Sequence, residues 1–264
     1  RRHSVEQELR QALEDNRIEV YFQPVVRISD GVVVGAEALA RIRVESGDLL
    51  LPDQFIDVAE DTGLIADLGS QVLSIALNRL GKWNTSSKNS LNMAVNVSAR
   101  QLSDPAFPEV IRSALSENNL DSSLVALEFT ESALIAANPV TGKVLEELTA
   151  LGVQIGLDDF GTGFSSLAYL KRFPINFLKI DRSFMSGLGT SDDDTAIVTG
   201  TIALAHSLDL EVVAEGVETE TQLTQLSKLK CNFAQGFHFS EPVTDAEFDR
   251  FVNRTFDPSE VSTN

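Results

Sequence analysis

Residues 18–41 read IEVYFQPVVRISDGVVVGAEALAR and contain two apolar, β-prone runs, Ile18–Val26 and Val32–Ala36. Only Arg27–Gly31 separates the two runs, and Asp30-Gly31 within this link is a turn signal. Two neighbouring parallel strands need a long crossover connection, and a link of this length cannot hold one. We therefore predict that the first two strands form an antiparallel hairpin.

The rest of the chain alternates between further β-prone runs and segments with helical periodicity. The runs are Asn92–Val97, Leu124–Phe129, Val153–Leu157, Phe177–Ile180, Glu211–Ala214 and Asn232–Phe237. Most are almost continuously apolar, which is typical of parallel strands buried on both faces. Eight strands in 264 residues favour an α/β fold, a TIM-like (β/α)₈ barrel with an antiparallel first strand, over a doubly wound sheet.

The predicted organisation is one barrel with short extensions at both ends. We expect a linker helix over residues 1–15, the barrel over 16–255 and a polar tail over 256–264. The chain opens Arg1-Arg2-His3 without a Met, so we expect it to be part of a longer protein.

Charge and cysteine content exclude several classes of function. The chain has 39 Asp and Glu residues against 21 Lys and Arg residues, a net charge of −18. Binding to a nucleic-acid polymer or an anionic membrane needs a basic face, and this balance argues against both. Cys231 is the single cysteine, which excludes an intramolecular disulfide and is typical of the cytoplasm.

Polar residues stand at the predicted carboxyl ends of the strands, where barrels carry their reactive groups. Taken strand by strand from the second onward, they are Glu37, Asn96, Glu128, Asp158 with Asp159, Lys179, Glu215 and Gln235. Each has a simpler interpretation: Asp158-Asp159 could form a turn, Glu128 could cap a helix, and Lys179 could pair with Asp181. These interpretations do not explain why all the residues converge on one end of the barrel.

The charges of this set predict bound cations. Its five carboxylates and one ammonium group leave a net charge of −4, which two divalent cations would neutralise. Oxygen ligands without His or Cys select Mg²⁺ or Mn²⁺ over Zn²⁺. Two such ions are typical of in-line displacement at phosphorus, with Lys179 orienting or activating the attacking water. Asp158 and Asp159 could serve both ions only if the backbone leaves the strand between them.

Two neighbouring features fit a phosphate substrate. Gly161 and Gly163 give the loop after Asp159 unusual backbone freedom, and Glu131 is a candidate to hold that loop. Arg41 follows Glu37 by four residues and is a candidate phosphate clamp, the alternative being a surface salt bridge.

The motifs together resemble those of EAL domains, the bacterial phosphodiesterases of cyclic di-GMP. They run in the family's order over nearly the whole chain and comprise Phe22-Gln23-Pro24, Glu37-Ala38-Leu39 with Arg41, Asn96-Val97-Ser98, Glu128-Phe129-Thr130-Glu131, Asp158–Leu167, Lys179-Ile180-Asp181, Glu215-Gly216-Val217-Glu218, Gln235-Gly236 and Phe237–Pro242. Two positions depart from the family: Ile42 stands where Trp is common and Phe164 where Tyr is frequent.

The resemblance implies a role for each site residue. Glu37, Asn96, Glu128 and Asp158 would bind one metal ion, and Asp158, Asp159 and Glu215 would be associated with the second. The expected catalytic set is Lys179, Glu37, Asp159 and Glu215, with Lys179 contacting the nucleophilic water. Arg41, Gln23 and Gln235 would contact or support the substrate, while Glu131, Gly161 and Gly163 would anchor the loop. The implied reaction hydrolyses cyclic di-GMP to linear pGpG.

The family also implies partners and a location. We expect a homodimer within a longer multidomain protein, with a GGDEF domain as the neighbour, in the cytoplasm or tethered to the inner membrane on its cytoplasmic side. The alternative function is a cyclic di-GMP receptor or regulatory module that binds the nucleotide without turnover.

Overall fold

The computed structural model of the chain describes residues 2–44, 46–135, 138–162 and 167–256. Within these residues the expected hairpin is present. Strand β1 (Ile18–Arg27) pairs antiparallel with β2 (Val33–Arg43), and Gln23 lies opposite Glu37. On its other edge β1 pairs antiparallel with β9 (Phe233–Ala234), so a single reversed strand closes the barrel.

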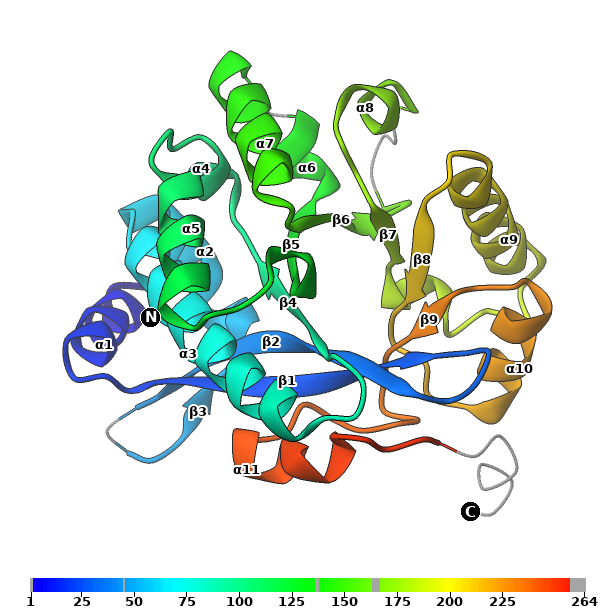
Figure 1. Cartoon of the computed structure of the whole chain (residues 1–264), viewed down its shortest axis with the longest axis horizontal. Coiled ribbons are helices and arrows are strands. Elements are labelled where there is room, and N and C mark those ends of the chain that lie inside the picture. The colour runs from blue at the N-terminus through cyan, green and yellow to red at the C-terminus, as the bar shows by residue number, and fades with distance from the viewer. Residues whose placement is uncertain (1, 45, 136–137, 163–166, 257–264) are drawn as a thin grey trace.

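The other barrel strands run parallel to β2. In chain order they are β4 (Asn92–Asn96), β5 (Val125–Thr130), β6 (Gln154–Phe160), β7 (Phe177–Ile180) and β8 (Glu211–Ala214), followed by β9. Each pairs with the next, and the ribbon in Figure 1 encloses a ring of strands with helices outside it. A short strand, β3 (Leu49–Leu50), pairs antiparallel with the far end of β2. The predicted TIM-like barrel with an antiparallel first strand is confirmed.

Helices cover the outside of the barrel (Figure 1). The α-helices are α1 (Arg2–Glu14), α2 (Pro52–Thr62), α3 (Ile65–Ser86), α4 (Ala99–Leu102), α5 (Phe107–Glu117), α6 (Glu131–Ile135), α7 (Pro139–Leu151), α8 (Leu167–Arg172), α9 (Asp192–Ser207), α10 (Glu220–Lys228) and α11 (Asp245–Phe248); short 3₁₀ helices are η1 (Ser122–Leu124), η2 (Arg182–Phe184) and η3 (Asp249–Phe251). In the described part of the chain, no helix is both long and apolar enough to span a membrane.

Local sequence sets the helix ends. The Asn138 side chain accepts hydrogen bonds from the backbone N–H groups of Val140 and Thr141 at the start of α7, and Pro139 occupies the first turn. Gly152 ends α7 with φ of 92°, as expected for a glycine after Leu151. Helix α1 packs onto the barrel, because Leu9 and Ala12 are fully buried.

Two strand boundaries differ from the prediction. β2 continues to Arg43 instead of ending at Glu37, because β1 pairs with it as far as Ile18 opposite Ile42. Glu37 therefore lies in the middle of β2 and reaches the site from there. β9 ends at Ala234, so Gln235 and Phe237 follow the strand instead of lying within it.

Candidate active site

The Lys179 ammonium group is the centre of the site. It projects from β7 and is 1% exposed. Its Nζ lies 2.7 Å from a carboxylate oxygen of Glu128 and 2.7 Å from one of Glu215. The distances are 3.2 Å to Glu37 and 3.5 Å to Asp158. Lys179 thus forms ion pairs with carboxylates from four other strands or strand ends. The alternative prediction, that Lys179 pairs with Asp181, is wrong: the Asp181 side chain accepts a hydrogen bond from the backbone N–H of Ser183 instead.

Neutral amides hold Glu37 in place. Asn96 Nδ2 donates to Glu37 Oε1 at 2.7 Å, and Gln235 Nε2 donates to Glu37 Oε2 at 2.6 Å. Gln235 Nε2 also donates to Gln23 Oε1 at 2.8 Å, and Gln23 Nε2 donates to the Ser240 carbonyl oxygen at 3.0 Å. A chain of hydrogen bonds therefore fixes Glu37 from the antiparallel strand β1 and from the segment after β9.

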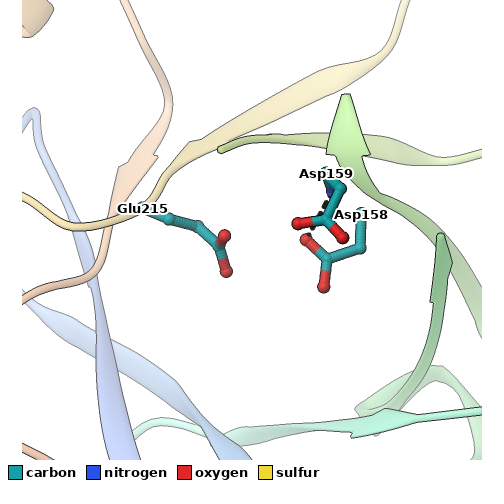
Figure 2. Close-up of side chains that lie close together, drawn as sticks. All are labelled: Asp158, Asp159 and Glu215. Carbon is teal, nitrogen blue, oxygen red and sulfur yellow. Dashed lines mark hydrogen bonds between the residues drawn. The ribbon is translucent and has the colours of Figure 1, made fainter. Parts of the chain in front are cut away.

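Asp158, Asp159 and Glu215 form a second group of carboxylates. One oxygen from each lies within 4.8 Å of the others. Asp159 has a φ of 56°, and the register between β6 and β7 shifts between Leu157 and Phe160. This left-handed residue breaks the alternation of the strand, so two consecutive aspartates turn to the same side (Figure 2). The backbone therefore leaves regular strand geometry at Asp159, which is the predicted condition for Asp158 and Asp159 to serve both metal ions.

The electrostatics of the site follow from burial and from Lys179. Burial would lower the pKa of Lys179, but the surrounding carboxylates, Glu128 first, raise that pKa well above its ordinary value. Burial raises the pKa of Glu128 well above its ordinary value and the pKa of Glu215 to about 8. For Glu37 burial also acts upward, yet the charge of Lys179 and the hydrogen bonds from Gln235 and Asn96 lower its pKa overall. The buried carboxylates of the site therefore favour bound protons or added positive charge.

A pocket of about 510 Å³ opens above these groups. Its floor carries Glu37, Glu128, Asp158 and Asp159, and its wall is apolar, formed by Leu39, Ile56, Ile65, Leu68 and Val72 of β2, α2 and α3. Pockets of several hundred Å³ with an apolar wall and a few polar groups are typical of small-molecule sites.

The other predicted residues do not line this pocket but lie next to, or within two positions of, residues that do. Arg41 is half-buried in β2, donates to the Ala40 carbonyl oxygen at 2.9 Å and lies over the Tyr21 ring, 5.7 Å from its centroid. Glu131 is buried as the first residue of α6. Gly161 has a φ of 100°, a conformation that side chains disfavour, directly after β6. Gly163 and Phe164 lie outside the described residues.

The structure adds two features that the sequence patterns did not predict. Phe237 is 59% exposed where the chain leaves β9 at the carboxyl end of the barrel, because the strand ends earlier than predicted. The Ser240 carbonyl oxygen supports Gln23, a contact between residues 217 positions apart. In the sequence, the predicted hairpin, which places Gln23 opposite Glu37, was the one feature that pointed to this network of hydrogen bonds around Glu37.

Fold and site together define the protein as a TIM-like barrel with a cluster of oxygen donors at the carboxyl ends of its parallel strands. Within that class the chain belongs to the EAL domain family, whose sequence profile matches residues 6–242. The departure at Ile42 leaves that position fully buried.

Curated relatives agree with this assignment. The chain is 43% identical over 236 residues to the bifunctional diguanylate cyclase/cyclic di-GMP phosphodiesterase MucR of Pseudomonas aeruginosa, covering 89% of this chain and 34% of the relative. It is 42% identical over 248 residues to the cyclic di-GMP phosphodiesterase NbdA of the same organism, covering 94% and 32%. The chain thus spans about a third of the length of these relatives.

Solved structures give the same result. The MucR phosphodiesterase in complex with c-di-GMP has a TM-score of 0.88 and 41% identity, covering 93% of this chain and 99% of that one. The EAL enzyme Bd1971 bound to cAMP and cyclic di-GMP has a TM-score of 0.90 and 32% identity, covering 95% of this chain and 69% of that one.

Proposed function

We propose that this chain is a cyclic di-GMP phosphodiesterase that hydrolyses one phosphodiester bond to give linear pGpG. The observation that carries the proposal is the Lys179 ammonium group bound among Glu37, Glu128, Asp158 and Glu215 at the carboxyl end of the barrel. The related phosphodiesterases MucR and NbdA support cyclic di-GMP as the substrate.

The donor set fits two Mg²⁺ or Mn²⁺ ions. Every donor is a carboxylate or amide oxygen, as these ions prefer, and the Oδ1 atom of Asn96 is available because its Nδ2 bonds Glu37. Glu37, Asn96, Glu128 and Asp158 would hold one ion; Asp158, Asp159 and Glu215 would hold the other, consistent with their close approach. Such ions, when bound, lower the pKa of water and neutralise the charge that develops on the phosphate.

The chain's own groups account for the positions of substrate and water. Lys179 stays charged among the carboxylates, so it donates hydrogen bonds and orients the attacking water without accepting its proton. The water oxygen forms a bond to phosphorus as the bond to the 3′-oxygen breaks. Asp159 or Glu215, whose carboxylate oxygens lie close to each other, would take up the one proton that the water loses, and the leaving 3′-oxygen would take a proton from solvent. Arg41 contacts a phosphate oxygen, and Gln23 and Gln235 keep Glu37 oriented.

We further propose the context of the domain. The relatives' greater length and the bifunctional name of MucR support a longer parent protein that includes a GGDEF domain. A homodimer and a location in the cytoplasm, or on the cytoplasmic side of the inner membrane through another part of the parent, complete the proposal.

The experiment is incubation of the chain with cyclic di-GMP and Mg²⁺ or Mn²⁺, followed by chromatographic separation of nucleotides, with nucleotide binding measured in parallel by calorimetry. Formation of pGpG that stops when EDTA is added supports the proposal. Binding without pGpG under either metal would contradict it and favour the receptor function.

A further inference from the structure

The segment that follows Asn96 is held by a buried polar side chain. Asn96 is the last residue of β4, and helix α4 begins directly after Ser98. The Gln101 backbone N–H donates to Ser98 Oγ at 3.2 Å. In return, the Ser98 backbone N–H and hydroxyl donate to Gln101 Oε1 at 3.1 Å and 3.2 Å, which completes a capping box. These hydrogen bonds fix the backbone two residues after Asn96.

The burial of Gln101 exceeds what helix capping needs. The capping boxes of α10 and α11 have equivalent side chains, Gln222 and Glu247, that are part-buried and exposed. Gln101 is 8% exposed, and it borders a small cavity together with apolar side chains, among them Val95 of β4 and Leu127 of β5. Burying an amide costs free energy that an exposed cap avoids, so capping alone does not account for the position of Gln101.

Gly69 of α3 makes room for this amide. A Cβ atom at position 69 would lie 2.3 Å from Gln101 Nε2 and 2.9 Å from Gln101 Cδ, closer than real side chains approach. Gly69 lies inside the helix and is not among the residues with positive φ, so its backbone conformation does not require glycine. Glycine is unfavourable inside a helix. The space that it leaves is therefore what distinguishes this position, and the Gln101 side chain fills that space.

The segment fixed by Gln101 carries Asn96, a proposed metal ligand with an exposed side chain on the active-site pocket. Asn96 Nδ2 donates to Glu37 Oε1 at 2.7 Å. Directly after Asn96, the Val97 backbone N–H donates to the Glu128 carbonyl oxygen at 2.7 Å, and the next anchor along the chain is the capping box. The backbone beyond Asn96 is thus held by β5 and by Gln101.

We propose that Gln101 is a positioning residue for the metal site and that Gly69 provides the space it occupies. By holding Ser98, Gln101 fixes the end of β4 and with it the Oδ1 atom of Asn96, the donor available to a metal ion. Metal affinity depends on the groups that orient a ligand as well as on the ligands themselves. The inference rests on the proposed function in one respect, which is that Asn96 binds a metal ion.

The test compares two Gly→Ala variants of α3 in Mn²⁺ titrations of the chain without nucleotide, with free Mn²⁺ measured by electron paramagnetic resonance. Gly69→Ala displaces the Gln101 amide and is expected to weaken the binding of one Mn²⁺ ion about fivefold, the effect of one hydrogen bond. Gly81→Ala is the matched control, because its Cβ would have its nearest neighbour at an ordinary 3.6 Å, and it is expected to bind Mn²⁺ like the unmodified chain. Alanine favours a helix more than glycine does, so weaker binding cannot come from a weakened α3.

A second pair of variants changes the other partner of the hydrogen bonds and serves if Gly69→Ala does not fold. Ser98→Ala removes the hydroxyl and is expected to weaken Mn²⁺ binding by a similar factor. Ser98→Thr keeps the hydroxyl, which also suits a helix cap, and is expected to bind Mn²⁺ like the unmodified chain. Equal Mn²⁺ affinities for Ser98→Ala and Ser98→Thr would contradict the proposal.

The unmodified chain separates this inference from the proposed function. If it binds Mn²⁺ and folded Gly69→Ala binds Mn²⁺ equally well, the role of Gln101 is overturned and the proposed function stands. If the unmodified chain binds no Mn²⁺, the metal site of the proposed function is overturned, and the role of Gln101 is overturned with it.

Discussion

Replacing Lys179 by Met removes the positive charge at the centre of the site while keeping most of the side-chain volume. Lys179 is 1% exposed and lies within 3.5 Å of carboxylate oxygens from Glu37, Glu128, Asp158 and Glu215. Removing one partner of a buried ion pair typically costs about 3–5 kcal/mol. For a chain of this size, that loss lowers Tm by about 6–20 °C. We expect a destabilisation in this range for Lys179→Met at pH 8 in EDTA, measured by urea and thermal unfolding.

The sign of the pH dependence gives a second check on the same variant. Without Lys179, the buried carboxylates have folded-state pKa values above their unfolded values, so the folded state binds more protons. Its stability must then fall as pH rises from the unfolded pKa through the folded one, and the loss is expected to be smaller at pH 5.5 than at pH 8. Lys82→Met, on an exposed position of α3, is the control and is expected to change stability by less than about 0.5 kcal/mol. Equal unfolding curves for the two variants in EDTA would refute the account of Lys179.

Three shorter predictions concern the site. Glu37→Gln keeps the size of the side chain and is expected to abolish turnover while the protein still unfolds in one cooperative transition; retained hydrolysis would exclude Glu37 as an essential ligand. Mg²⁺ binding is expected to release protons and to tighten as pH rises toward 8, because burial raises the pKa of Glu215 to about 8 and bound protons compete with the ion; calorimetry in two buffers of different ionisation enthalpy measures the release, and identical heats would contradict it. Phe237 follows Gln235 by two residues, and we expect its exposed ring to contact the substrate, so Phe237→Ala should raise KM severalfold with an unchanged Tm because the removal costs no core packing; an unchanged KM would exclude that contact.

The sequence was sufficient for the barrel topology because one short link decides it. Arg27–Gly31 is too short for a crossover, and the structure has the antiparallel pair that this length requires. The end of β2 was mispredicted because Ala38, Leu39 and Ala40 have weak strand preference on their own. Pairing with β1 keeps them extended, and that contribution comes from residues about 20 positions away.

The residues of the site could be chosen from their positions after or within the strands, but their contacts could not. The distances around Lys179 depend on the register of several strands and on the closure of the ring. The left-handed backbone at Asp159 was anticipated only as a condition for two adjacent aspartates to act together.

The most direct test of the central claim is the mass spectrum of nucleotides after incubation of the chain with cyclic di-GMP in ¹⁸O-labelled water, with Mg²⁺ or Mn²⁺ present. Hydrolysis at this site predicts pGpG that carries one ¹⁸O atom in its terminal 5′-phosphate, and no such product with Glu37→Gln. Recovery of intact cyclic di-GMP of unchanged mass under both metals would contradict the account.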